Sequence, residues 1–161
     1  MKFLISNLAW NKNELPSIIE LLKSKKIKNL EFSINNLTKH NSKYKTIRDI
    51  KNFWNSKSIK LYSMQSILYK INDAFIFGTL RQQKKFYNEV AKKIKLANSL
   101  DAKILVLGSP KNKKVFDKNK KECDDLMVKF LRKISLLCKK YNVILCLEAN
   151  PKIYKTEYLT K

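Results

Sequence analysis

The sequence is poor in histidine and glycine, and each shortage excludes a class of site. His40 is the only histidine, so there is no two-histidine metal site and no H-E-x-x-H motif. A Ser-His-Asp triad would need His40, which falls in a polar stretch expected to be a solvated loop. Gly78 and Gly108 are the only glycines, which excludes a P-loop and a G-x-G-x-x-G fingerprint. Binding of ATP or NAD through those loops is therefore excluded.

Acidic residues and arginines are also scarce beside the lysines. The chain has 35 Lys and Arg against 13 Asp and Glu, a net charge of +22. Only Arg48, Arg81 and Arg132 are arginines, the side chains that read phosphates and base edges with two hydrogen bonds. This pattern indicates a bias in composition rather than a specific nucleic-acid surface. We expect nucleic acid to bind only non-specifically, through the net charge.

The cysteines and the apolar runs bear on the compartment. Cys123, Cys138 and Cys146 are odd in number and contain no C-x-x-C pair, which argues against a secreted disulfide framework. We expect Cys138 and Cys146 to be buried small hydrophobic residues. No apolar stretch approaches the ~18 residues of a membrane span, and the first ten residues lack the features of a signal peptide. These observations predict a cytoplasmic protein.

Short apolar runs alternate with helical patterns along the chain. The runs at 3–8, 29–33, 59–65, 102–108 and 143–147 are predicted strands, and apolar periodicity predicts helices over 13–25, 47–54, 82–98 and 120–141. The polar stretches after the second strand and at 110–121 are expected to be solvated loops. Continuous runs such as ILVL and VILCL are typical of parallel strands covered by helices, which predicts an α/β fold. A chain of 161 residues is long enough for one domain with its own core.

Polar residues gather at the carboxyl ends of the predicted strands, where parallel α/β sheets carry their functional groups. In chain order they are Asn7, Trp10, Glu31, Gln65, Ser109, Glu148 and Asn150. Most of them have a simpler interpretation: Glu31 in solvent or against a helix, Asn7 and Ser109 as turn caps, Gln65 bonded to loop backbone, and Trp10 as packing. Glu148 is harder to explain in this way. An isolated carboxylate at the end of a buried strand is costly unless it is paired or bound to a cation.

Several stretches resemble the sugar phosphate isomerase/epimerase family, whose members are xylose isomerase-like TIM barrels. They are ISNLAW at 5–10, SMQSILY at 63–69, IFGT at 76–79, AKKIKLANSLDAKILVLGSPKNKK at 91–114, and LCLEANP at 145–151 with the Tyr and Thr that follow. The resemblance covers nearly the whole chain, so that 1–161 would be a single partial TIM-barrel domain. It would supply about five of the eight strands of such a barrel.

The resemblance implies a divalent metal (Mn, Mg, Co or Zn) at the mouth of the barrel, with Glu148 as a metal ligand and catalytic residue. Asn7, Trp10, Glu31, Gln65 and Asn150 would line the substrate pocket. The metal would polarise a small sugar or sugar phosphate, and carboxylates would move the proton beside its carbonyl through an enediolate. The family's other ligands come from later strands. The chain alone is therefore expected to be inactive, as a truncated or split barrel.

Two alternatives stay open from the sequence. The chain could be a non-catalytic interaction module that self-associates, or binds a complementing C-terminal half barrel, through its unpaired edge strands. An enzyme of the endonuclease IV type would share the barrel class and would use the positive charge. Those enzymes hold their metals with a histidine-rich cluster, for which a single histidine is a poor match.

Overall fold

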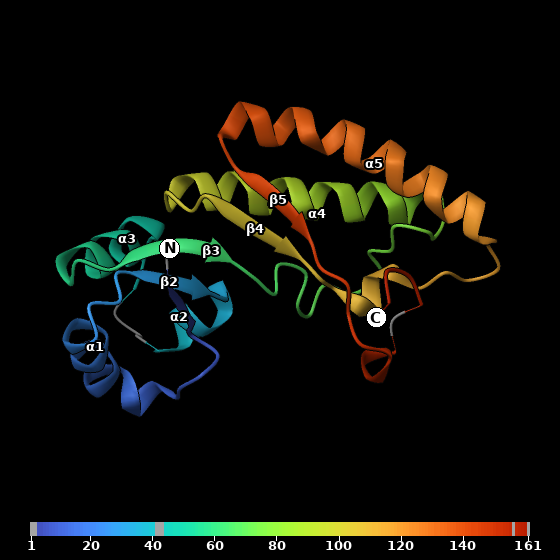
Figure 1. Ribbon diagram of the computed structural model, residues 1–161. Coiled ribbons are helices and arrows are strands. Elements are labelled where there is room, and N and C mark those ends of the chain that lie inside the picture. Colours follow the sequence, from blue (N-terminus) through green and yellow to red (C-terminus); the bar gives the residue numbers. More distant parts are fainter. Residues whose placement is uncertain (1–2, 41–43, 156, 161) are drawn as a thin grey trace.

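The computed structural model describes residues 3–40, 44–155 and 157–160, and in it five strands form one parallel sheet (Figure 1). The strands are β1 (Leu4–Ser6), β2 (Asn29–Phe32), β3 (Lys60–Met64), β4 (Ile104–Leu107) and β5 (Ile144–Leu147). The helices are α1 (Leu15–Ser24), α2 (Ile34–His40), α3 (Ile47–Ser56), α4 (Leu80–Ser99) and α5 (Lys120–Tyr141), with 3-10 turns η1 (Lys12–Glu14), η2 (Pro110–Lys113) and η3 (Lys152–Tyr154). No helix within these ranges is long and apolar enough to cross a membrane.

The strands follow one another across the sheet in chain order, β1-β2-β3-β4-β5. Right-handed crossovers between sequential strands place every helix on the same face, as in a barrel, whereas a doubly wound sheet reverses its strand order. Helices α4 and α5 pack together beside β4 and β5 (Figure 1). Within the described residues β1 and β5 each pair with one neighbour, so both are edge strands. The fold is the predicted α/β sheet of a partial barrel.

Strand pairing separates two faces of the sheet. Ser6 lies in register with Glu31, Glu31 with Ser63, and Ser63 with Ile104, so these four side chains share one face. We call it the open face, because its residues are only partly buried apart from Ser63. A register shift after Leu30 is what brings Glu31 opposite Ser63.

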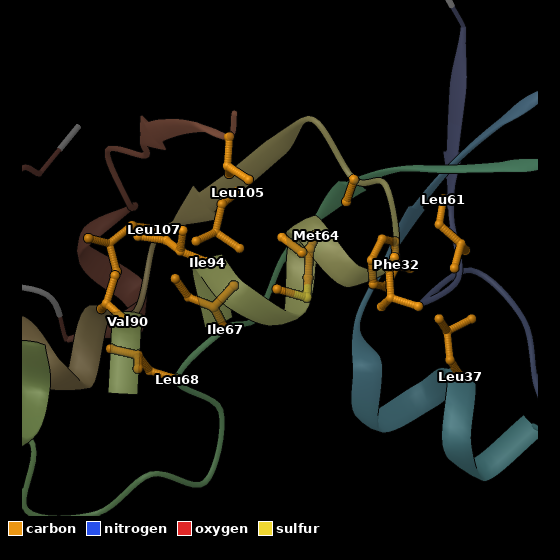
Figure 2. Packing of buried hydrophobic residues seen from close by; sticks show 14 of the residues in the cluster. Phe32, Leu37, Leu61, Met64, Ile67, Leu68, Val90, Ile94, Leu105 and Leu107 are labelled. Carbon is orange, nitrogen blue, oxygen red and sulfur yellow. The ribbon is translucent and has the colours of Figure 1, made fainter. Parts of the chain in front are cut away.

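The other face carries the hydrophobic core. The side chains that alternate with the open face are fully buried: Leu30, Phe32, Met64, Leu105 and Leu107. Leu105 and Leu107 of β4 pack with the apolar stripe of α4, including Val90 and Ile94 (Figure 2). This stripe was predicted from periodicity, and the structure confirms it. Both long helices begin at capping boxes, at Thr79 and Asn119, which satisfy the first free N–H groups of each helix.

Three local predictions are wrong. The polar stretch after the second strand forms α2, whose Leu37 is fully buried, and His40 is the last residue of this helix rather than part of a loop. The basic stretch at 110–121 is not wholly solvated, because η2 buries Lys113. Cys138 is buried as expected, but Cys146 is only partly buried because it lies on an edge strand.

Candidate active site

Side chains from three neighbouring strands meet around Glu31 on the open face. The Nε2 of Gln65 donates to the Oε2 of Glu31 at 2.9 Å and to the Oγ of Ser6 at 2.5 Å. The hydroxyl of Ser63 lies 3.5 Å from the Oε1 of Glu31. We call Ser6, Glu31, Ser63 and Gln65 the Glu31 cluster. It sits at the carboxyl ends of β1, β2 and β3, where parallel barrels hold their active sites.

The environment of Glu31 favours its protonated form. Burial is the main cause that raises the pKa of this carboxyl above its ordinary value, and the negative charge of Glu148 raises it further. The hydrogen bond from Ser63 acts in the opposite direction and lowers the pKa. Glu148, on a strand far from Glu31 in the sequence, therefore lies close enough for its charge to affect the protonation of Glu31.

Glu148 follows β5 directly, and its main-chain N–H continues the ladder to the oxygen of Leu107 at 3.2 Å. Its side chain is exposed, which corrects the expectation of a carboxylate at the end of a buried strand: β5 is the edge of the sheet. The carboxylate accepts no hydrogen bond from any residue within the described ranges.

Gly108, at the end of β4, makes room for this carboxylate. A Cβ built on Gly108 would overlap the Oε2 of Glu148 and would lie 3.2 Å from the Nδ2 of Asn150. The backbone of Gly108 is not left-handed, so a side chain at this position would act through its contact with the carboxylate of Glu148.

Lys113 fixes the chain that carries Glu148. Its side chain is 1% exposed, and its Nζ donates to the main-chain oxygen of Glu148 and to the Oδ1 of Asn150, both at 3.1 Å. We call these three residues the Lys113 clamp. Burial lowers the pKa of the Lys113 ammonium, and the charge of Glu148 opposes that change. The turn η2, which follows β4, is thereby tied to the end of β5.

The structure brings together some of the predicted residues and separates others. Glu31 contacts Gln65, and the Lys113 clamp joins Glu148 to Asn150. Asn7 is fully buried. Its Nδ2 donates to the main-chain oxygen of Ser33 at 3.1 Å, and its Oδ1 accepts from the main-chain N–H of Ser33 at 2.8 Å. Trp10 is buried within the core cluster. Roles for these residues in binding a substrate stay predictions.

Sequence reasoning missed four residues of the site: Ser6, Ser63, Gly108 and Lys113. Strand alternation could have found Ser63, which lies two positions before Gln65 and so shares its face. No local signal marks Lys113, which stands in a run of lysines and becomes special only through contacts 35 and 37 residues away.

The donors present fit a divalent cation in part. Glu148 offers an unbonded carboxylate, the kind of oxygen ligand that Mg²⁺ and Mn²⁺ prefer. Within the described parts of the chain, however, no three His, Cys, Asp or Glu residues come together to hold a metal. A complete site would need donors beyond these.

Comparisons with known proteins bear on the fold. No family model and no curated protein matches the sequence. Among solved structures, D-psicose 3-epimerase from Clostridium cellulolyticum H10 superposes with a TM-score of 0.72 at 18% identity, over 99% of this chain and 55% of that chain. The IOLI protein with a bound zinc atom has a TM-score of 0.68 at 16% identity, over 91% of this chain and 51% of that chain. A sugar phosphate isomerase/epimerase from Parabacteroides distasonis has a TM-score of 0.66 at 12% identity, over 91% of this chain and 50% of that chain.

This chain spans about half the length of these structures. At such identities the likeness establishes the fold, and it confirms the fold expected from the resemblance. The chain has the fold of the sugar phosphate isomerase/epimerase barrels, the xylose isomerase-like TIM barrels, over about half of their length.

Proposed function

We propose that this chain supplies part of the active site of a metal-dependent isomerase or epimerase that acts on a small sugar or sugar phosphate. The observation that carries the proposal is the carboxylate of Glu148. It accepts no hydrogen bond within the described residues, lies over a glycine, and stands at the carboxyl end of the fifth strand of a sugar-epimerase fold.

In this proposal Glu148 is a ligand of the metal and takes part in catalysis. Glu148 would help to hold a divalent cation, whose positive charge would polarise the carbonyl oxygen of the sugar. A carboxylate removes the proton from the carbon beside that carbonyl, and the electron pair passes into an enediolate. Return of the proton to the neighbouring carbon would isomerise the sugar, whereas epimerisation needs a second acid that delivers a proton to the opposite face of the same carbon.

The polar end of the sheet would bind the substrate. Asn7, Trp10, Glu31, Gln65 and Asn150 are the proposed pocket residues. The Glu31 cluster and Glu148 are well placed for sugar hydroxyls, because their oxygens lie on the open face. Asn7 and Trp10 are buried, so they would act from behind the pocket: Asn7 ties the end of β1 to Ser33 after β2, and Trp10 packs in the core.

The remaining metal ligands would come from outside the described residues. A second half barrel that pairs with the edge strands β1 and β5 would supply them, either as a complementing C-terminal half or as another copy of the chain. Exposed apolar side chains on β5 support such pairing, since Ile144 is 64% and Leu147 41% exposed. The same observation favours the second candidate function, an interaction module without catalysis.

A half-barrel chimera tests the proposal. The chain is fused to the carboxyl-terminal half of the D-psicose 3-epimerase that it resembles, and loss of the C3 proton of ketohexoses is followed by NMR in D₂O with Mn²⁺. We expect exchange that needs Mn²⁺ and falls about 10²-fold or more in Glu148→Gln. A folded chimera whose exchange is unchanged by Glu148→Gln would contradict the proposal. Oligomers without any exchange would favour the interaction module, and a monomeric chain would count against that module.

A further inference from the structure

Hydrogen bonds from neighbouring strands hold both the side chain and the main chain of Glu31. Both contacts of the Gln65 amide nitrogen are within the cluster, one to Glu31 and one to Ser6. The main chain on either side is fixed as well, because Asn7 donates its N–H to the oxygen of Glu31 at 2.9 Å and Gln65 donates its N–H to Phe32 at 2.8 Å. The carboxylate of Glu31 is therefore oriented by β1 and β3 before any ligand arrives.

The two carboxylates of the site have opposite surroundings. Glu148 is exposed and bonds to no described donor, whereas Glu31 is partly buried among uncharged neighbours, Ser6 on β1 and Ser63 and Gln65 on β3. The charged group that acts on Glu31 is Glu148, on β5. Burial and this like charge raise the pKa of Glu31. A carboxylate whose pKa is raised is a stronger base, which suits it to take up a proton and return it.

We propose that Glu31 is the proton-carrying carboxylate of this site, with Gln65 and Ser6 as positioning residues that aim it, while Glu148 serves the cation. The inference rests on the proposed function and deepens it. A carboxylate oxygen of Glu31 takes the proton as the C–H bond beside the carbonyl breaks, and the electron pair of that bond enters the enediolate. The new O–H of Glu31 then gives its proton to the neighbouring carbon on the same face, which isomerises the sugar and restores the carboxylate.

The first test needs neither metal nor sugar and uses the full chain. The carboxyl carbons of ¹³C-labelled glutamates are titrated by NMR in the wild type, in Glu148→Gln, and in Glu20→Gln, an exposed control on α1. We expect Glu31 to titrate above its ordinary value of 4.5, and its midpoint to fall in Glu148→Gln but not in Glu20→Gln. A Glu31 that titrates at or below this ordinary value, or whose midpoint is unchanged in Glu148→Gln, would overturn the proposal.

The second test separates catalysis from a structural role. In the chimera, Glu31→Gln should lower kcat by about 10²-fold or more with little change in KM. Glu31→Asp should restore part of the activity, and Gln65→Met should lower kcat rather than raise KM. Full proton exchange in the Glu31→Gln chimera would overturn the role of Glu31 and would leave the proposed function standing. A chimera without exchange in any variant would instead overturn the proposed function, and with it this role.

Discussion

The ammonium of Lys113 donates a hydrogen bond of 3.1 Å to the side-chain oxygen of Asn150. Both side chains are buried, and a second bond from the same ammonium reaches the main-chain oxygen of Glu148. A buried charge is costly, so its retention needs partners of this kind. The contact fixes the backbone on both sides of Ala149, and therefore the direction in which Glu148 leaves the strand.

Replacing Lys113 by Met should destabilise the fold. The substitution leaves the oxygens of Asn150 and Glu148 without their donor, and loss of hydrogen bonds to a charged group costs about 1.5–3 kcal/mol. Relief of the buried charge offsets part of that loss, so we expect a net decrease of about 1–3 kcal/mol in the free energy of unfolding. Urea denaturation measures it. Lys111→Met, at an exposed position two residues earlier, is the control and should change stability by less than about 0.5 kcal/mol. A Lys113→Met variant as stable as its control would refute the clamp.

Gly108→Ala should disturb the site more than the fold. The added methyl overlaps a flexible carboxylate rather than backbone, so Glu148 moves aside at little cost in stability. We expect a thermal midpoint within a few degrees of the wild type but weaker binding of Mn²⁺. Gly78→Ala is the matched control, because its added methyl would also overlap a side chain, that of Gln82, but away from the site. Equal Mn²⁺ affinity in both variants would show that the glycine at 108 does not serve Glu148.

The raised pKa of Glu31 predicts how stability changes with pH. From its ordinary value of 4.5 up to the raised pKa, the folded chain binds more protons at this site than the unfolded chain does. Stability therefore falls as the pH rises through that window. Glu31→Gln removes this dependence, so its stability relative to the wild type should increase between pH 4 and pH 7. Urea unfolding at several pH values measures the difference. A difference that does not change with pH would mean that the fold does not perturb Glu31.

Asn7→Ala should cost stability through the backbone of β2. Both hydrogen bonds to Ser33 are lost, and each leaves a buried polar group unpaired, at about 1–3 kcal/mol for the pair. Asn7→Asp should recover part of the loss, because its oxygen can still accept from the N–H of Ser33. Equilibrium unfolding compares the two. Equal stability of Asn7→Ala and the wild type would contradict this structural role and would favour Asn7 as a residue that contacts the substrate.

The regular elements were predictable from sequence because their signals are local. The long apolar stripes placed a helix at 82–98, where α4 spans Leu80–Ser99, and at 120–141, where α5 spans Lys120–Tyr141. Helix α2 was missed because only Ile34 and Leu37 are apolar among its seven residues, too few to show a period. Helix α2 instead depends on the burial of Leu37, which is a tertiary contact.

The site was predictable only as a set of strand ends. Which side chains share a face depends on register, and a shift between Leu30 and Glu31 decides that Glu31 meets Ser63. The burial of Lys113 depends on residues far away in the chain, so neighbouring lysines in the same run gave no reason to single it out. The interpretation of Glu148 also relied on a buried fifth strand, whereas the strand lies at the edge of the sheet.

The most direct test of the account asks whether a divalent cation binds at Glu148. Traces of Mn²⁺ are added to the ¹⁵N-labelled chain, because paramagnetic broadening reports even weak binding and so does not require a complete ligand set. The account predicts selective broadening of the amide signals of Gly108, Glu148 and Glu31, which disappears in Glu148→Gln. Broadening confined to other acidic residues, or the same broadening in Glu148→Gln, would contradict it.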